Sequence, residues 1–115
     1  MSEPLSLTSR RLRSQFERAL RAASSGRIQL RLYVSGLTPK STCAISDLER
    51  LCRERLTGRR CDVEIIDIYQ QPERAVEAQI VAVPTLIKIE PAPVMRSIGK
   101  LTEGDRVLKN LGLAA

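Results

Sequence analysis

A strand, a helix and a second strand follow one another along the middle of the chain, and this succession limits the possible folds more than any other feature of the sequence. Apolar and polar residues alternate over residues 28–34, which predicts a strand with one buried face. Thr38 and Pro39 are residue types expected at a helix N-cap and at the first helical position. Residues 61–68 are rich in valine and isoleucine and predict the second strand. Two strands joined by a helix imply a parallel, right-handed βαβ unit.

The second half of the sequence predicts two short helices and a hairpin. Pro72 opens the first of these helices. Residues 85–89 and 94–99 predict two strands, and the prolines between them favour a tight hairpin connection. Thr102 and Asp105 have the spacing of a capping box before the last helix. The apolar residues assigned to the two helices are Ala75, Val76, Ile80, Val107, Leu108 and Leu111. The resulting order is βαβαββα, which predicts an α/β domain.

We expect a single domain over residues 28–113, because 115 residues suffice for one compact core. Residues 1–27 are predicted to be a basic extension, since they contain six arginines and only two glutamates. Leu12 and Phe16 belong to an apolar stripe that predicts a helix in part of this extension. The helix is either a basic arm for acidic partners, nucleic acid or an anionic membrane, or a solvated helix that docks on the domain or on a second subunit. The second interpretation is favoured, because most runs of charge are solvated faces.

Residue types that are rare or missing exclude several functions. The sequence contains no histidine, which removes Ser–His and Cys–His pairs and the commonest zinc ligand. Its few aromatic residues argue against a nucleic-acid reader that stacks bases. Cys43, Cys52 and Cys61 form no CxxC motif, and their odd number favours packing roles in a reducing cytoplasm. No stretch has the length of a membrane span. We therefore expect a cytoplasmic protein without a metal, a cofactor or catalytic residues.

The element order and the VPT segment at residues 83–85 resemble the thioredoxin fold, in which the matching proline is cis. Pro84 is therefore a candidate cis-proline, and a trans bond before an edge strand is the alternative. Thioredoxins carry their reactive cysteines at the first helix N-terminus, where this chain has residues 37–40 without a cysteine. Cys43 lies one turn further along and leaves at best a lone thiol. A thioredoxin-like redox protein with a degenerate active site is the second functional hypothesis.

Four blocks of the sequence form a specific set: LRLYVSGLTPKS, VEIIDIYQQPERA, VAVPTLIKIEPAPVMRSIG and LTEGDRVLKNLGL. Together they resemble the KaiB family of circadian clock proteins, in a register that is nearly continuous from about Leu30 to Leu113. The resemblance implies a non-enzymatic protein that binds the ring-shaped ATPase KaiC and modulates its phosphorylation or timing cycle. It also implies other clock or signalling proteins as partners, and a homo-oligomer, a dimer or a tetramer.

The resemblance further implies two arrangements of the C-terminal half. One is a thioredoxin-like form that binds the ATPase, and the other is a resting form in which the C-terminal half is rearranged. A single stable thioredoxin-like fold is the alternative. The sequence differs from many family members at Cys43, where they have a basic residue, and near Gly112, where they have an acidic one. Asn110 stands where they have a glycine. These differences lie in regions used for partner binding and fold preference.

The partner-binding residues are predicted from the motif match and from charged positions that the apolar stripes leave free. They lie on the first helix, at the start of the second helix, and on the last two strands. For the last two strands, the alternative is that the charged residues merely cover a solvated face. The predicted set is Lys40, Arg50, Gln71, Glu73, Arg74, Lys88 and Arg96.

Overall fold

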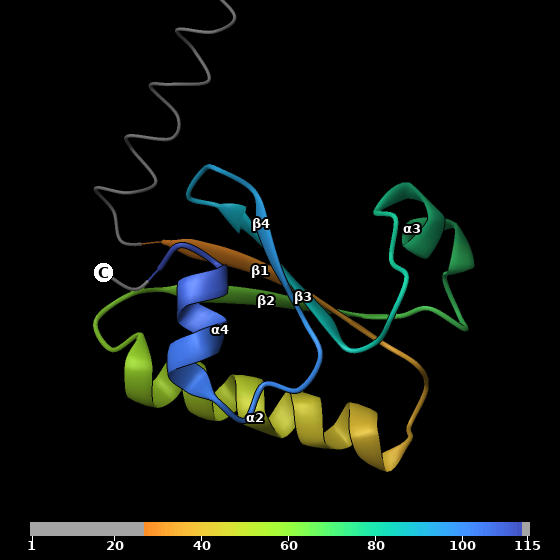
Figure 1. Cartoon of the computed structure of the whole chain (residues 1–115), viewed down its shortest axis with the longest axis horizontal. Helices are drawn as coiled ribbons and strands as arrows, with labels where there is room; N and C mark the ends of the chain where they lie inside the picture. The colour runs from red at the N-terminus through yellow and green to blue at the C-terminus, as the bar shows by residue number, and fades with distance from the viewer. Residues whose placement is uncertain (1–26, 114–115) are drawn as a thin grey trace, which may run out of the picture.

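The computed structural model describes residues 27–113, which form a four-stranded sheet with three helices (Figure 1). The strands are β1 (Ile28–Val34), β2 (Cys61–Asp67), β3 (Thr85–Glu90) and β4 (Met95–Ile98), and the helices are α2 (Pro39–Arg55), α3 (Pro72–Glu77) and α4 (Gly104–Asn110). The order of the strands in the sheet is β2-β1-β3-β4. The predicted order of elements is confirmed. The predicted helix of the basic extension lies outside the described residues.

The first half of the domain is the parallel βαβ unit that the sequence predicts. β1 pairs with β2 in parallel, with Ile28 opposite Cys61. Thr38 is the N-cap of α2, and its hydroxyl oxygen accepts a hydrogen bond from the backbone N–H of Ser41 at 3.2 Å. Pro39 occupies the first turn, where its missing N–H has no helical partner to lose. Short-range chemistry therefore determines where α2 begins.

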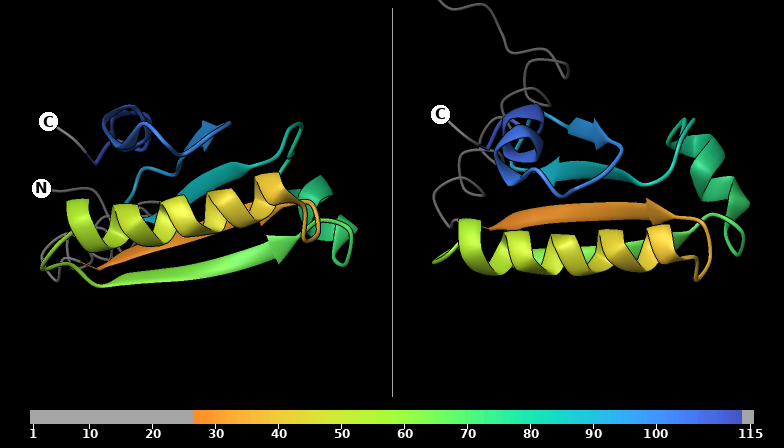
Figure 2. Two further views of the ribbon diagram at one scale, coloured as in Figure 1. Left: turned by 90° about the horizontal axis from the view of Figure 1, so that it is seen from below. Right: turned by 60° about the horizontal axis from the view of Figure 1, so that its bottom comes forward.

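The main core lies between the sheet and the two helices α2 and α4, which both pack against one face (Figure 2). Alternation along β1 directs every second residue into this core. The buried residues of the main core are Ile28, Leu30, Leu32, Val34, Ala44, Leu48, Leu51, Leu56, Leu86, Leu101, Val107, Leu108 and Leu111. A smaller cluster of Tyr33, Ile66 and Ile87 lies on the other face, where the segment after α3 covers part of it. The rest of that second face carries no helix in the described part of the chain.

Two details at the helices differ from the sequence predictions. The N-cap of α4 is Glu103, without a side-chain hydrogen bond, so the capping box predicted at Thr102 and Asp105 is wrong. Asp105 instead pairs with Arg55 of α2, which offers its carboxylate an opposite charge. The helix α3 ends at Glu77, so Ile80 lies outside it and packs on the second face from the following segment.

The last two strands form the predicted antiparallel hairpin. β3 pairs with β4 over residues 85–88 and 95–98. The Val83–Pro84 peptide bond, for which the sequence analysis favoured the cis form, is cis, and Pro84 is buried at the start of β3. The bonds before Pro91 and Pro93 in the connection are also cis.

Replacing Gly112 by alanine is expected to lower the free energy of unfolding by about 2 kcal/mol. Gly112 has a φ of +71°, and a Cβ atom there would lie 2.8 Å from Sδ of Met95. The backbone strain costs about 1 kcal/mol, and the forced contact adds about 1 kcal/mol. Urea unfolding measures the loss. Gly58 is a matched control, because its φ is +79° and nothing lies within 4 Å of an added Cβ. Equal losses for Gly112→Ala and Gly58→Ala would contradict the packing of Gly112 against Met95.

Candidate interaction surface

The strand register places charged and apolar side chains in one row across the second face of the sheet. Glu64 on β2 lies opposite Arg31 on β1. Ile87 on β3 lies between Arg31 and Arg96 of β4. Tyr33, one position along the same face, is 2% exposed and packs in the cluster with Ile87. The row therefore combines a buried apolar centre with arginines and a carboxylate.

Arg74 on α3 reaches this row and forms a bidentate ion pair with Glu64. Its Nη1 and Nη2 atoms lie 2.5 Å and 3.1 Å from Oε2 and Oε1 of Glu64. The Nε atom of Arg31 is 3.4 Å from Oε1 of the same carboxylate. The hydrogen bond from Arg74 holds the pKa of the Glu64 carboxyl below its usual value, and the charges of both arginines act in the same direction. Two arginines thus orient one carboxylate and tie α3 to the sheet.

Arg96 ties the end of β4 to the chain that follows α3. Its guanidinium donates hydrogen bonds to the backbone carbonyl groups of residues 78 and 79, at 2.8 Å and 3.3 Å. On α3, Nη1 of Arg74 lies 3.4 Å from Oε1 of Gln71. These contacts bring several predicted partner-binding residues to one side of the molecule. We call the following residues the α3 surface: Glu64, Gln71, Glu73, Arg74 and Arg96.

Large apolar side chains are exposed at the end of the molecule that carries α3. Leu37, in the connection from β1 to α2, is 92% exposed, and Tyr69, in the connection from β2 to α3, is 73% exposed. Oδ1 of Asp67 accepts hydrogen bonds from the backbone N–H groups of Gly36 at 3.0 Å and Tyr69 at 2.9 Å, which holds the two connections together. We call the exposed apolar residues of this end the apolar tip: Leu37, Tyr69, Val76 and Val81. Exposed apolar groups beside arginines are typical of protein-binding surfaces.

Two predicted residues, Lys40 and Arg50, lie on α2, on the other side of the sheet from the α3 surface. Both are exposed. Arg50 pairs with Asp47 on the same helix at 2.9 Å. Lys40 lines a pocket of about 360 Å³, together with Cys43 and Pro84. The structure therefore divides the predicted set between two sides of the molecule.

Lys88 is not on a free surface, contrary to the basis on which the sequence analysis selected it. It is 2% exposed and faces the main core beside Leu86. Its Nζ atom lies 3.7 Å from the position that a Cβ on Gly112 would occupy. Burial lowers the pKa of Lys88, and the positive charge of Arg59 lowers it further. The sequence misled here because apolar residues occupy both faces of β3, so alternation did not show which face is inside.

The groups on these surfaces are of kinds that occur in protein interfaces. Within residues 27–113, no group of three or more histidine, cysteine or acidic side chains is placed to hold a metal ion. In the same range, no helix is long and apolar enough to cross a membrane. What the arrangement does offer is oriented arginines, a bidentate carboxylate and exposed apolar side chains, the groups that recur in protein interfaces.

Residues 31–113 match the family model described as the KaiB domain. The chain belongs to the KaiB family. The circadian clock protein KaiB3 of Synechocystis sp. is 45% identical over 87 residues, which cover 76% of this chain and 84% of that protein. The circadian clock oscillator protein KaiB of Synechococcus sp. (strain RCC307) is 43% identical over 84 residues, 73% of this chain and 76% of that protein.

Solved structures show that this KaiB-family chain has a thioredoxin-like fold, as the sequence predicts. The N-terminal domain of Synechococcus elongatus SasA matches with a TM-score of 0.62 at 19% identity, covering 74% of this chain and 79% of that one. Chloroplastic thioredoxin z matches with a TM-score of 0.60 at 22% identity, covering 86% of each chain. The thioredoxin-like arrangement, rather than the resting one, is therefore the fold of the described residues.

Around Pro84, where the sequence analysis looked for thioredoxin chemistry, this KaiB-family chain has one thiol. Cys43 is exposed and lines the pocket with Pro84, and no second cysteine lines that pocket. The two other departures from many family members lie on the last helix and just after it. Nδ2 of Asn110 donates a hydrogen bond to Oγ of Ser97 at 3.2 Å, which fastens α4 to β4.

Three residues on the surfaces of this KaiB-family protein were not among the predicted partner-binding residues: Glu64, Leu37 and Tyr69. Glu64 organises the α3 surface, and its place in an alternating strand between apolar residues was the available signal. Leu37 and Tyr69 were not selected because exposed apolar residues in connections have no pattern that separates them from buried ones. Their exposure follows only from the path of the chain.

Proposed function

We propose that this KaiB-family protein is a non-enzymatic regulator that binds a KaiC-type ATPase and modulates its phosphorylation or timing cycle. The observation that carries the proposal is the match of residues 31–113 to the KaiB domain, together with relatives of more than 40% identity that are named as circadian clock proteins. The matched range contains nearly the whole described domain. A role in clock regulation therefore concerns the domain itself rather than an added segment.

The α3 surface and the apolar tip are proposed as the main contact with the ATPase. Arg74 and Arg96 are held by Glu64 and by backbone carbonyl groups, so little side-chain entropy is lost when a partner binds them. Tyr69 and Leu37 supply exposed apolar area at the neighbouring end of the sheet. Lys40 and Arg50 on α2 are proposed as a second, smaller contact.

A change of arrangement in the C-terminal half is part of the proposal. Lys88 is covered by the segment around Gly112, so it becomes available to a partner only if that segment moves. This half contributes an edge strand of four residues and a helix of seven, both short elements. We propose that a resting form with a rearranged C-terminal half exists beside the described one, and that free protein self-associates as a dimer or a tetramer.

The proposal is tested on the phosphorylation of a KaiC-type ATPase from the same organism. The phosphorylated fraction of the ATPase is followed over hours with and without this protein, by electrophoresis that separates the two forms. We expect the protein to change the time course, and Cys43→Ser to act like the unmodified protein. Loss of the effect in Cys43→Ser would instead support the thioredoxin-like redox hypothesis. An unchanged time course with the unmodified protein would contradict the proposed regulation.

A further inference from the structure

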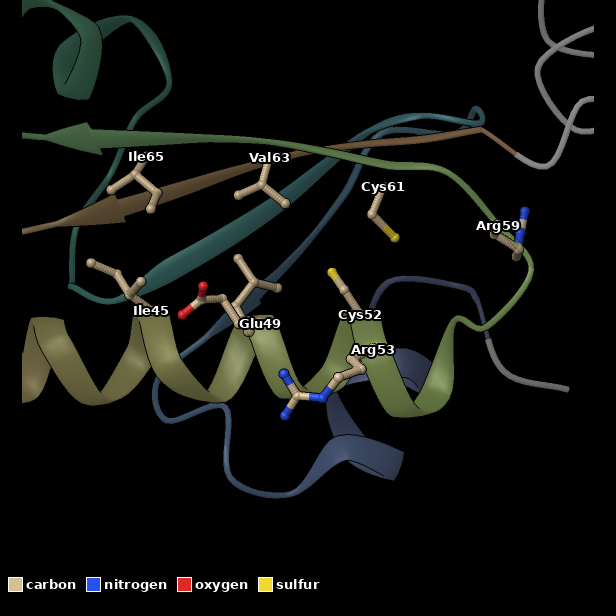
Figure 3. Close-up of a pocket in the computed structure, with 9 residues that line it drawn as sticks. Ile45, Glu49, Cys52, Arg53, Arg59, Cys61, Val63 and Ile65 are labelled. Carbon is tan, nitrogen blue, oxygen red and sulfur yellow. The ribbon is translucent and has the colours of Figure 1, made fainter.

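A groove of about 530 Å³ lies between α2 and the edge strand β2, away from the α3 surface (Figure 3). Ile45 on α2 faces Val63 and Ile65 on β2 across it. Val63 and Ile65 are 40% and 45% exposed, so small solutes can enter the groove. Its lining contains two of the three cysteines of the chain.

These two cysteines face each other at one end of the groove. Cys52 lies in the last turn of α2, and Cys61 is the first residue of β2. In Figure 3 their sulfur atoms point toward each other at this end of the groove. Both residues are partly exposed. Cys43 lies near the other end of α2 and lines a different pocket. If one of these two thiols is oxidised, the other is therefore the cysteine placed to form a disulfide with it.

The environment gives the two thiols different roles. Burial raises the pKa of Cys52 to about 12, and the charge and hydrogen bond of Cys61 contribute to the same rise. Cys52 therefore keeps its proton near neutral pH, which leaves Cys61 as the nucleophile of the pair. Arg53 and Arg59 also line the groove, against one acidic residue, Glu49.

We propose that Cys52 and Cys61 are a modification site at which hydrogen peroxide oxidises the two thiols to a disulfide between α2 and β2, and a thiol reductant restores them. The Cys61 thiolate attacks one peroxide oxygen, so that an S–O bond forms, the O–O bond breaks, and a hydroxide leaves and is protonated to water. The product is a sulfenic acid on Cys61. The Cys52 sulfur then attacks Cys61, the S–O bond breaks, and the thiol proton leaves with the departing hydroxide as a second water. The thiols lose two electrons in total, and the peroxide gains them.

This disulfide would connect elements that already pack together. It closes only the short connection 53–60, and residues 28–34 keep their parallel pairing with residues 61–67. The pair is separate from the α3 surface, and the inference is independent of whether the chain binds an ATPase. A small thiol reductant reverses the reaction by thiol–disulfide exchange.

The test treats the full chain with hydrogen peroxide, blocks the remaining thiols, and maps tryptic peptides without reduction. Trypsin cleaves after Arg53 and Arg60, so Cys52 and Cys61 fall on different peptides, and Cys43 falls on a third. A partner within the same chain has an effective concentration on the order of millimolar. At about 10 μM protein, the Cys52–Cys61 linkage is therefore expected to exceed linkages between chains by about 100-fold. Dithiothreitol should remove it.

Three variants make the result specific. Cys43→Ser should keep the linkage at its full yield. Cys52→Ala should leave Cys61 as a sulfenic acid that dimedone traps, and Cys61→Ala should leave Cys52 largely unoxidised. The proposal is overturned if Cys43 dominates the linked peptides, if the thiols reach sulfinic acid without linkage, or if Cys52 and Cys61 stay reduced while Cys43 is oxidised.

Discussion

Replacing Leu86 by alanine is expected to lower the free energy of unfolding by about 3 kcal/mol. Leu86 lies at the centre of the sheet on β3, is 0% exposed, and belongs to the core that α2 and α4 close. Truncation leaves a cavity at a place where strands on both sides restrict collapse. Urea unfolding of the purified variant measures the loss as a shift of the midpoint without a change of slope.

Leu37→Ala is the matched control for this loss. The same atoms are removed from a side chain that is 92% exposed, so the expected change is within about 0.5 kcal/mol. Similar losses in Leu86→Ala and Leu37→Ala would contradict the described core. The Leu37 variant has a second use, since the apolar tip is proposed to contact the ATPase, and it should bind that partner more weakly while folding normally.

Arg74→Glu is expected to weaken binding of the KaiC-type ATPase by about 30-fold or more, the effect of losing a central arginine in an interface. The substitution also places two carboxylates side by side at Glu64, where the bidentate pair now stands. Because solvent reaches this pair, whose side chains are 25% and 48% exposed, only a small loss of stability is expected. Titration of a labelled variant with the ATPase measures the affinity.

A charge swap separates a direct contact from a structural one. In the double variant Glu64→Arg/Arg74→Glu the ion pair is restored with its charges exchanged. If Arg74 contacts the ATPase, binding remains weak in the double variant, whereas recovered binding would mean that Arg74 acts only by holding α3. Lys109→Glu, an equal change of charge on the exposed side of α4, should bind normally.

The fold was largely predictable because local patterns and long-range packing agree in the first half of the chain. The alternation over 28–34 and the Thr38–Pro39 start of α2 are short-range signals, and the structure places these elements where the sequence predicts them. At the start of α4, in contrast, the local sequence pattern gave a wrong prediction. Thr102 and Asp105 had the spacing of a cap, but Asp105 pairs with Arg55, fifty positions earlier in the chain.

The candidate surface was only partly predictable, since its contacts depend on register and on chain path. Gln71 and Arg74 were selected from the sequence and do lie together. The ion pair between Arg74 and Glu64 can be predicted only when the register of β2 in the sheet is known. The hydrogen bonds from Arg96 to the carbonyl groups of residues 78 and 79 likewise depend on the path of the chain after α3. Lys88 was misplaced because apolar residues occupy both faces of β3, so the sequence did not show that Lys88 faces the main core. The pairing of Cys52 with Cys61 likewise requires a folded helix beside a strand.

Size-exclusion chromatography with light scattering will decide whether this protein has the proposed partner. The full chain is run alone and after incubation with a KaiC-type ATPase from the same organism, in ATP and in ADP. The proposed function predicts a complex that contains both proteins, forms slowly, and accumulates in one nucleotide state and not in the other. Separate elution of the two proteins in both nucleotides, at concentrations of tens of micromolar and after long incubation, would contradict it.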